Sequence, residues 1–288
     1  MTALTQALLV AGGVGLRLRP LTDVLPKCLL PIGGRPLLGI WLDQLVSSGF
    51  QRIVVNTHHH AELVTDYVRS CGYDDRVILA HEPTLLGTAG TLLKHAPSFG
   101  AQSIFFAHAD NLSIFKVEAF AQRHACRRGD VVMTMMTFET DAPRQCGIVE
   151  QDVDGLVVAF HEKQADPPGN LANAAIYIVD PAVAETAARL GREIVDFSTD
   201  VIPLLLGRVQ TFHNPIYHRD IGTPESLALA QFDYPMALAA AGKPLGPIGV
   251  VPELFASRPA LTHVFLKALA EAYAPSDQRL RVRDERNE

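Results

Sequence analysis

The sequence predicts an α/β fold: a Rossmann-like, mostly parallel sheet flanked by helices, with a small antiparallel lid inserted beside it. Two observations lead to this prediction. Through the first 140 residues, short apolar segments typical of strands alternate with segments typical of helices, and such alternation indicates βαβ units. Farther on, two strand-like segments flank Asp154-Gly155, a dipeptide that favours a tight hairpin between antiparallel strands.

The N-terminal half is expected to alternate regularly. The expected strands are residues 7–10, 52–56, 76–80, 103–107 and 131–137. The helices expected between them are residues 36–48, 61–70, 89–96 and 116–127. Gly49 directly follows the first helix and is a typical helix stop. The lone tryptophan, Trp41, falls in that helix and is expected in the core.

The pattern changes after residue 140. Residues 147–150 and 156–160 flank the hairpin turn, and a third strand is expected at residues 174–179. These three strands form the predicted lid. Helices are expected at residues 185–190, 199–206, 223–231 and 260–274. Residues 276–288 are densely charged, so a solvated tail is predicted there.

Composition limits the classes of partner. The formal charge at pH 7 is −6, which argues against general nucleic-acid binding, because that requires a broad basic face. No apolar run approaches the roughly 20 residues of a membrane span, and no secretory signal is recognised. Cysteines 28, 71, 126 and 146 form no C-x-x-C pair. We therefore expect reduced thiols and a cytoplasmic protein that binds neither membrane nor nucleic acid.

A glycine-rich loop follows the first expected strand. Gly12, Gly13 and Gly15 stand within four positions, and glycine lets backbone N–H groups approach and cradle a phosphate. Arg17 and Lys27 follow the loop. Residues 1–42 contain four basic residues and one acidic residue, so this segment carries +3 in a chain that carries −6. A local positive field in an acidic protein favours a small polyanionic ligand.

Two other nucleotide-binding loops are excluded. The G-x-x-x-x-G-K-[ST] pattern of P-loop proteins is absent. The G-x-G-x-x-G pattern of dinucleotide-binding proteins fails because Leu18 stands at its third glycine, and the second expected strand ends in Asn56 instead of an acid. A loop that merely turns the chain is the remaining alternative, but it does not account for the flanking cations.

Residues 12–18 (Gly-Gly-Val-Gly-Leu-Arg-Leu) and 26–32 (Pro-Lys-Cys-Leu-Leu-Pro-Ile) together resemble the signature of the sugar-phosphate nucleotidylyltransferases. The resemblance extends over about residues 7–231 and implies that the loop binds a nucleoside triphosphate. The residues that it assigns to nucleotide binding are Ala11, Gly12, Gly13, Gly15, Arg17 and Lys27. Arg17 and Lys27 are also assigned to catalysis. Leu16 departs from the family, which usually has Thr or Ser there, so a hydroxyl contact to phosphate is lost.

A second part of the nucleotide site is implied at residues 86–90 (Leu-Gly-Thr-Ala-Gly). By the resemblance, Glu82 and Gly87 face the nucleobase. Thr88 is assigned to the nucleotide too, and its hydroxyl can cap the helix that follows. An ordinary helix N-terminus is the alternative interpretation. The sequence of this segment is most similar to that of mannose-1-phosphate and heptose-1-phosphate guanylyltransferases, which favours GTP.

Two aspartates form the metal site that the resemblance implies. Asp110 ends an apolar strand, at the sheet edge where α/β proteins bind ligands. Asp220 lies within residues 217–225, which also resemble the family. In the family two such aspartates jointly hold Mg²⁺, an ion that hard carboxylate oxygens suit, and Asp110 is assigned to catalysis. His108-Ala109 precede Asp110 where Asn-Gly is commoner, and either aspartate alone could be a turn or cap residue.

Residues 58–60 are three consecutive histidines, a composition that could suggest another metal site. Consecutive side chains on a regular element point in different directions, so three cannot face one ion. A polar loop that enters the next helix is the expected role.

The resemblance places the sugar phosphate after the hairpin. Glu162-Lys163 follow the second hairpin strand, and in the family this pair binds the sugar hydroxyls through Glu and the phosphate through Lys. Gly147 and Asn173 match positions beside the sugar, and Asn111 is also assigned to the substrate. An exposed ion pair at a strand end is the alternative interpretation of Glu162-Lys163.

The resemblance therefore implies an Mg²⁺-dependent enzyme whose partners are a nucleoside triphosphate, with GTP favoured, and a mannose- or heptose-type sugar 1-phosphate. Residues 1–234 are expected to form the nucleotidyltransferase domain and residues 235–288 a helical extension with the charged tail. Assembly into a homo-oligomer is compatible with the sequence. Two alternatives stay open: a uridylyl-, thymidylyl- or cytidylyltransferase acting on another phosphomonoester, and a catalytically silent nucleotide-sensing subunit of the same fold.

Overall fold

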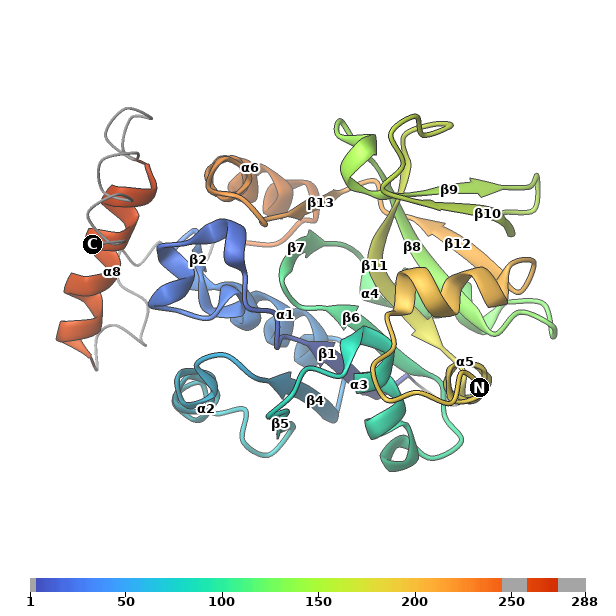
Figure 1. Cartoon of the computed structure of the whole chain (residues 1–288), viewed down its shortest axis with the longest axis horizontal. Coiled ribbons are helices and arrows are strands. Elements are labelled where there is room, and N and C mark those ends of the chain that lie inside the picture. The colour runs from blue at the N-terminus through green and yellow to red at the C-terminus, as the bar shows by residue number, and fades with distance from the viewer. Residues whose placement is uncertain (1–3, 245–257, 274–288) are drawn as a thin grey trace.

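The computed structural model describes residues 4–244 and 258–273 of the chain (Figure 1). The charged tail predicted at residues 276–288 lies outside the described residues. Within the described ranges, the predicted helices and strands of the first 140 residues are confirmed, with ends that shift by two residues at most.

A nine-stranded sheet forms the centre of the molecule. Four neighbouring strands run parallel, because each is separated from the next by a helical crossover. In sheet order they are β6 (Ile104–His108), β1 (Gln6–Val10), β4 (Arg52–Thr57) and β5 (Val77–His81). This arrangement confirms the predicted α/β class with a mostly parallel sheet.

Helices cover both faces of the sheet, because successive strand residues point to opposite sides. In β1, Ala7 and Leu9 belong to one hydrophobic core, and Leu8 belongs to the other. The helices that pack into the first core include α1 (Leu37–Ser47), α2 (Ala61–Ser70) and α4 (Val117–Ala125). Those that pack into the second are α3 (Gly87–His95) and α5 (Pro181–Ala188).

The antiparallel part of the molecule extends this sheet. β11 (Leu171–Val179) pairs with β6 and with β8 (Met133–Glu139), and β12 (Val209–His213) runs parallel to β8. The predicted hairpin is confirmed as β9 (Gly147–Gln151) and β10 (Val157–Glu162). Ala172 of β11 pairs with Ile148 of β9, so the hairpin joins the edge of the main sheet instead of forming a separate layer.

Two short antiparallel pairs were not predicted from the sequence. β2 (Pro31–Ile32) pairs with β3 (Arg35–Pro36), and β7 (Asn111–Ile114) pairs with β13 (Tyr217–Asp220). Strands of two to four residues are too short to show a clear hydrophobic period. The helix predicted over residues 199–206 is instead a π turn at Phe197–Val201 followed by a 3-10 turn at Ile202–Leu205.

The helix expected at residues 223–231 is longer than the sequence suggests. α6 (Pro224–Ala240) continues through Pro235, so the domain boundary expected at residue 234 falls inside a helix, and the division into two parts stays a prediction. α8 (Pro259–Ala272) lies at the end of the molecule away from the hairpin (Figure 1). Among the described residues, no helix combines the length and the hydropathy of a membrane span.

Candidate functional site

A cleft of about 770 Å³ lies beyond the C-terminal end of β6. Nine of the residues that the sequence assigns to catalysis, metal or substrate line it, although they come from segments up to about 200 residues apart. They are Arg17, Lys27, Asp110, Asn111, Gly147, Glu162, Lys163, Asn173 and Asp220. Ligands of α/β proteins bind at this end of parallel strands, so the cleft is the candidate site.

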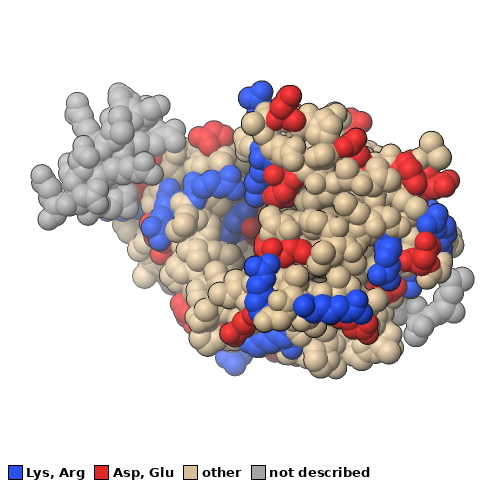
Figure 2. Space-filling view, turned by 45° about the vertical axis from the view of Figure 1, so that its right-hand side comes forward, with Lys and Arg blue, Asp and Glu red and all other residues tan. Residues whose placement is uncertain are grey.

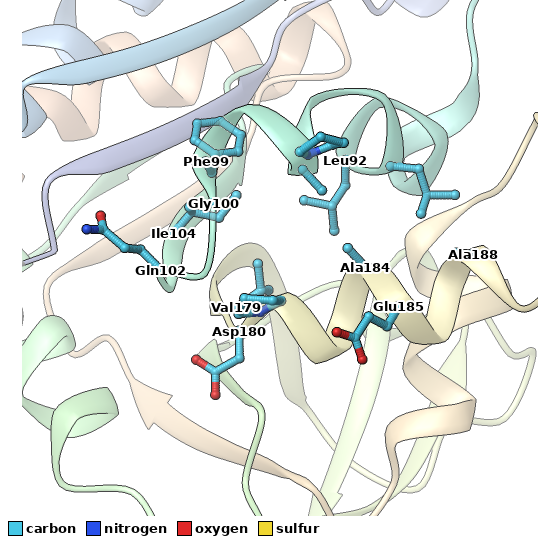
Figure 3. Close-up of a pocket in the computed structure, with 14 residues that line it drawn as sticks. Leu92, Phe99, Gly100, Gln102, Ile104, Val179, Asp180, Ala184, Glu185 and Ala188 are labelled. Carbon is cyan, nitrogen blue, oxygen red and sulfur yellow. The ribbon is translucent and has the colours of Figure 1, made fainter.

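A second cavity, of about 310 Å³, lies between α3 and α5 (Figure 3). Its lining is almost entirely apolar and includes Leu92, Phe99 and Ile104. The acidic residues Asp180 and Glu185 are its only charged lining residues. A cavity without a cation does not suit a phosphate, and no predicted site residue lines it.

Lys27 joins the two predicted metal ligands. Its Nζ donates to Asp110 Oδ2 at 3.0 Å and to Asp220 Oδ1 at 2.9 Å. The pairing of β7 with β13 sets Asp220 opposite Asn111, which brings the two aspartates together. Arg17 reaches the same cluster, with 3.5 Å between its Nη2 and Asp220 Oδ2.

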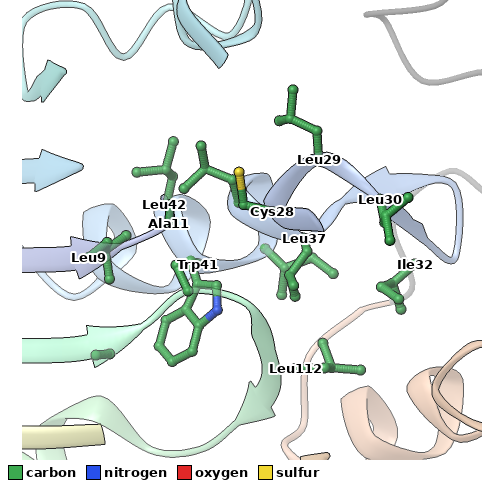
Figure 4. Packing of buried hydrophobic residues seen from close by; sticks show 14 of the residues in the cluster. Leu9, Ala11, Cys28, Leu29, Leu30, Ile32, Leu37, Trp41, Leu42 and Leu112 are labelled. Carbon is green, nitrogen blue, oxygen red and sulfur yellow. The ribbon is translucent and has the colours of Figure 1, made fainter. Parts of the chain in front are cut away.

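The hydrophobic core fixes this cluster in place (Figure 4). Cys28, Leu29 and Leu30, directly after Lys27, are fully buried against α1. Trp41 of α1 donates its indole N–H to the Asn111 carbonyl at 2.9 Å, one residue beyond Asp110. The lysine and the aspartate therefore rest on the same packed helix, and Trp41 is a core residue as predicted.

Burial and charge act in opposite directions on the pair. Burial alone would lower the pKa of Lys27, but the two aspartates outweigh it, and the pKa of the lysine is raised. Burial alone would raise the pKa of Asp110, but the Lys27 ammonium outweighs it, and the pKa of that carboxyl is lowered. Both groups are therefore charged at neutral pH.

The donor set suits magnesium. Carboxylate oxygens of Asp110 and Asp220 already converge on a single cation, the Lys27 ammonium. Within the described ranges there is no cluster of three or more His, Cys, Asp or Glu that could hold a metal. Mg²⁺ is commonly bound by one or two carboxylates and completed by water and substrate phosphates, so two aspartates fit it better than a metal that needs a full protein cage.

The glycine loop offers free N–H groups, but not all of those expected. Among the described residues, the backbone N–H groups of residues 13–17 donate to no protein group. The N–H groups of Ala11 and Gly12 both donate to Asn56 Oδ1, at 2.6 and 3.2 Å, so they are not available to a phosphate in this conformation. Gly15 has φ +68°, and a Cβ there would lie 2.8 Å from Thr22 Cγ2, so this turn requires glycine.

Glu82 does not face open space in the structure, contrary to the expectation for a nucleobase contact. Its side chain is fully buried. Its Oε2 accepts from Asn56 Nδ2 at 3.2 Å and from Thr91 Oγ1 at 3.1 Å. Its Oε1 is buried and has no hydrogen-bond partner in the described part of the chain. The sequence could not reveal the Asn56 contact, because it joins β4 to the end of β5.

Gly87 and Thr88 also differ from the expectation. The helix begins at Gly87, two residues earlier than predicted, so Thr88 lies in its first turn and is not the cap. A Cβ at Gly87 would lie 2.4 Å from the Val195 carbonyl, which shows that this glycine packs against backbone. Thr88 Oγ1 instead accepts from the Phe197 N–H and donates to Asp196 Oδ2, at 2.8 and 3.3 Å.

The three histidines hydrogen-bond to backbone carbonyls of neighbouring loops. His58 bonds to the Glu82 carbonyl at 2.7 Å, and His59 bonds to the Thr22 carbonyl at 2.8 Å. His60 bonds to the Asp23 carbonyl at 3.2 Å. The three rings thus contact three different carbonyls on two sides of the glycine loop.

The predicted sugar-phosphate residues lie together on the hairpin side of the cleft. Lys163 Nζ and Glu162 Oε1 are 3.2 Å apart, and the lysine side chain is 65 % exposed. Gly147 is packed beside Glu162, whose Oε2 would lie 2.6 Å from a Cβ there. Asn173 is held by Tyr177, whose hydroxyl accepts from Asn173 Nδ2 at 2.7 Å.

Several cleft residues were missed by the sequence. His108, Asp196 and His218 line the cleft, but the sequence assigned no site role to any of them. Burial lowers the pKa of His108, and it lowers the pKa of His218 to about 4, so both rings are neutral at pH 7. The face of the molecule in Figure 2 carries acidic and basic side chains interspersed, without a broad basic patch.

Comparison with known proteins agrees with this geometry. The chain matches the family described as nucleotidyl transferase over residues 6–235. It is 29 % identical to the mannose-1-phosphate guanylyltransferase of Mycobacterium tuberculosis, over 81 % of this chain and 66 % of that protein. It is 30 % identical to the mannose-1-phosphate guanylyltransferase catalytic subunit beta of Drosophila pseudoobscura pseudoobscura, over 77 % and 60 %. The chain thus spans less than two thirds of the length of these relatives.

Solved structures show the same fold. A Bacillus anthracis protein assigned as a glucose-1-phosphate thymidylyltransferase, solved with sucrose, aligns with a TM-score of 0.74 at 20 % identity, over 85 % of this chain and 98 % of that one. HddC from Yersinia pseudotuberculosis, complexed with GMP-PN, aligns with a TM-score of 0.68 at 24 % identity, over 80 % and 100 %.

Proposed function

The chain belongs to the nucleotidyl transferase family, and from that premise we propose that it transfers a nucleotidyl group from a nucleoside triphosphate to a sugar 1-phosphate. GTP and a mannose- or heptose-type sugar phosphate are the proposed substrates, and the cytoplasm is the proposed location. The observation that carries the proposal is the convergence of nine predicted residues on one cleft. They include three cations and two aspartates, the groups that two anionic substrates and a metal need.

In the proposed reaction, an oxygen of the sugar phosphate attacks the α-phosphorus. A new P–O bond forms, the bond from the α-phosphorus to the bridging oxygen breaks, and pyrophosphate leaves. The attacking phosphate is already anionic near neutral pH, so no general base is required. Repulsion between two polyanions is the main obstacle, and positioning with electrostatic stabilisation overcomes it.

The residues divide between the two substrates. The free N–H groups of residues 13–17 and the Arg17 guanidinium bind the triphosphate. Asp110 and Asp220 hold Mg²⁺, which when bound neutralises charge on the α-phosphate and the leaving pyrophosphate. Lys163, on the far side of the cleft, holds the attacking phosphate.

Lys163→Ala is expected to lower kcat/KM for the sugar phosphate about tenfold to a hundredfold, because one charge-assisted contact is lost. Binding of the nucleoside triphosphate alone, measured by calorimetry, should hardly change. The exposed Lys116 provides a matched control, and Lys116→Ala should keep both activities. Loss of triphosphate binding in a folded Lys163→Ala protein would contradict the division between the two substrates.

Glu82 gives a physical reason to favour guanine. A carboxylate only accepts hydrogen bonds, and guanine presents two adjacent donors on its Watson–Crick edge, whereas uracil and thymine present one donor between two acceptors. Oε1 of Glu82 is buried without a partner, so a base donor would satisfy it. Glu82 is fully covered in the structure, so contact with a base requires the groups that cover it to move. The names of the relatives point to the same base.

Glu82→Gln is expected to lower kcat/KM for GTP about tenfold to a hundredfold, because hydrogen bonds to a charged acceptor are worth about 1.5–3 kcal/mol. Values for UTP and dTTP should change much less. Rates with all four triphosphates measure this effect, and Glu62→Gln on the surface is the matched control. A higher kcat/KM for UTP or dTTP than for GTP in the wild-type protein would overturn the guanylyl proposal.

A matrix of four nucleoside triphosphates against mannose-, glucose- and heptose-1-phosphates, followed by pyrophosphate release, tests the proposed function. The expected result is release that depends on Mg²⁺ and on both substrates, with GTP and a mannose- or heptose-type phosphate the best pair. A best pair with another base or another phosphomonoester favours the first alternative. Triphosphate binding without turnover for any pair favours the silent sensing subunit.

A further inference from the structure

We propose that His108 is a substrate-binding residue that hydrogen-bonds a hydroxyl of the sugar ring and helps to select the sugar. The inference rests on the proposed function and goes beyond it, because it names a contact for the sugar. His108 is the last residue of β6, two residues before Asp110, and it lines the cleft. A group at this place lies between the proposed metal site and the proposed sugar site.

The ring packs edge-on against Phe106, with 6.3 Å between the ring centroids, but its nitrogens make no hydrogen bond within the described residues. Its Nε2 is buried and has no hydrogen-bond partner, and among the described residues no bond to the other ring nitrogen is found. A neutral imidazole carries one donor and one acceptor, and a buried polar atom without a partner costs about 1–3 kcal/mol. A substrate group that enters the cleft beside the ring would satisfy it.

The backbone next to His108 leaves room for such a group. Ile176 of β11 pairs with Ala107 of β6, so Ala175 would be the next partner, opposite His108. Ala175 instead has φ +54°, and its N–H donates to Asn173 Oδ1 at 2.9 Å. The ladder therefore ends beside the histidine, and both Ala175 and Asn173 line the cleft. A non-glycine residue at positive φ is uncommon and is often found at a functional site.

The charges around the ring favour a hydroxyl over a phosphate. The charged groups that act on His108 are the carboxylates of Asp110, Asp196 and Glu162 and the ammonium of Lys27. Lys27 is already paired with two carboxylates, so the surroundings of the ring are acidic and repel a phosphate. A sugar hydroxyl is neutral, and it can donate to a carboxylate while it accepts from, or donates to, the imidazole.

His108→Phe removes the hydrogen bond and keeps an aromatic ring of similar size. It is expected to lower kcat/KM for the best sugar 1-phosphate about tenfold to a hundredfold, while the calorimetric Kd for GTP changes less than about threefold. His108→Gln, whose amide can donate and accept, should recover part of the loss. His213→Phe, at an exposed position on β12, is the control. Thermal unfolding of each variant separates a contact from a folding defect.

A series of deoxy-sugar 1-phosphates identifies the contact. For one deoxy analogue, kcat/KM of the wild-type protein should fall by about the same factor that His108→Phe shows with the full sugar phosphate. The His108→Phe variant should have equal kcat/KM for that analogue and for the full sugar phosphate. The inference would be overturned if every deoxy analogue lowered kcat/KM by the same factor in the wild-type protein and in His108→Phe. It would also be overturned if His108→Phe weakened GTP binding as much as it weakens use of the sugar phosphate.

The outcome stays separable from that of the proposed function. If the wild-type protein released no pyrophosphate with any sugar 1-phosphate, the proposed function would be wrong. The same panel would then be titrated directly by calorimetry. A sugar phosphate that binds more weakly to His108→Phe would still support the contact, whereas unchanged binding, or no binding to the wild-type protein, would overturn it.

Discussion

Asp110→Asn and Asp220→Asn are each expected to lower kcat at least about a hundredfold, because each removes one charged ligand from a reaction that depends on charge stabilisation. Asparagine keeps the size of the side chain, so the fold should be retained. The two aspartates converge on one cation in the structure, so the double variant should lose little more than either single variant. Pyrophosphate release at saturating substrates, with Mg²⁺ varied, measures the effect.

Asp130 offers a matched control for these variants. It is exposed, paired with Arg128 and not among the residues that line the cleft, so Asp130→Asn should leave kcat unchanged. Each aspartate variant should also need a higher Mg²⁺ concentration for half-maximal activity. Near-normal kcat and an unchanged Mg²⁺ requirement in both variants would remove Asp110 and Asp220 from the metal site.

Lys27→Met is expected to have an effect of similar size, a loss of at least about a hundredfold in kcat/KM for GTP. The substitution keeps a long, unbranched side chain and removes the charge. It leaves the partly exposed carboxylates of Asp110 and Asp220 close together without their shared cation, so repulsion between them should lower the Tm. It also takes a cation from the phosphates. Calorimetry of GTP binding and the Tm of the variant measure the two consequences separately.

Lys267→Met, at an exposed position on α8, is the control for this variant. Lys27→Arg should recover only part of the activity, because the planar guanidinium cannot replace a compact ammonium between two carboxylates. A folded Lys27→Met protein that binds GTP with unchanged Kd and keeps its turnover would show that Lys27 serves the fold alone.

The sequence predicted the sheet and most of the cleft because their signals are local. The strand–loop–helix order of residues 7–48 follows from short apolar runs and a glycine-rich turn, and both motifs around Lys27 are continuous in the sequence. Asp110 was placed from the apolar strand that precedes it. For these residues, the local pattern and the tertiary structure agree, so the local pattern was sufficient to predict their positions in the fold.

The remaining features depend on contacts between distant segments. The pairing of β7 with β13 joins Asp110 to Asp220 across 110 residues, and neither strand has a period long enough to recognise. Asn56 Oδ1 accepts hydrogen bonds from the N–H groups of Ala11 and Gly12, and no local sequence pattern predicts such a contact. His108 was noted as a departure from the family, but its unpaired ring became visible only when β11 was placed beside β6.

The fate of the α-phosphate distinguishes nucleotidyl transfer to a sugar phosphate from hydrolysis of the triphosphate. The protein is mixed with Mg²⁺, a sugar 1-phosphate and GTP labelled at either the α- or the γ-phosphate, and the products are separated. We expect the α-label in a nucleoside diphosphate sugar and the γ-label in pyrophosphate, in equal amounts and only when the sugar phosphate is present. The α-label in free GMP, or the γ-label in inorganic phosphate, in reactions free of contaminating phosphatase would contradict nucleotidyl transfer to a sugar phosphate.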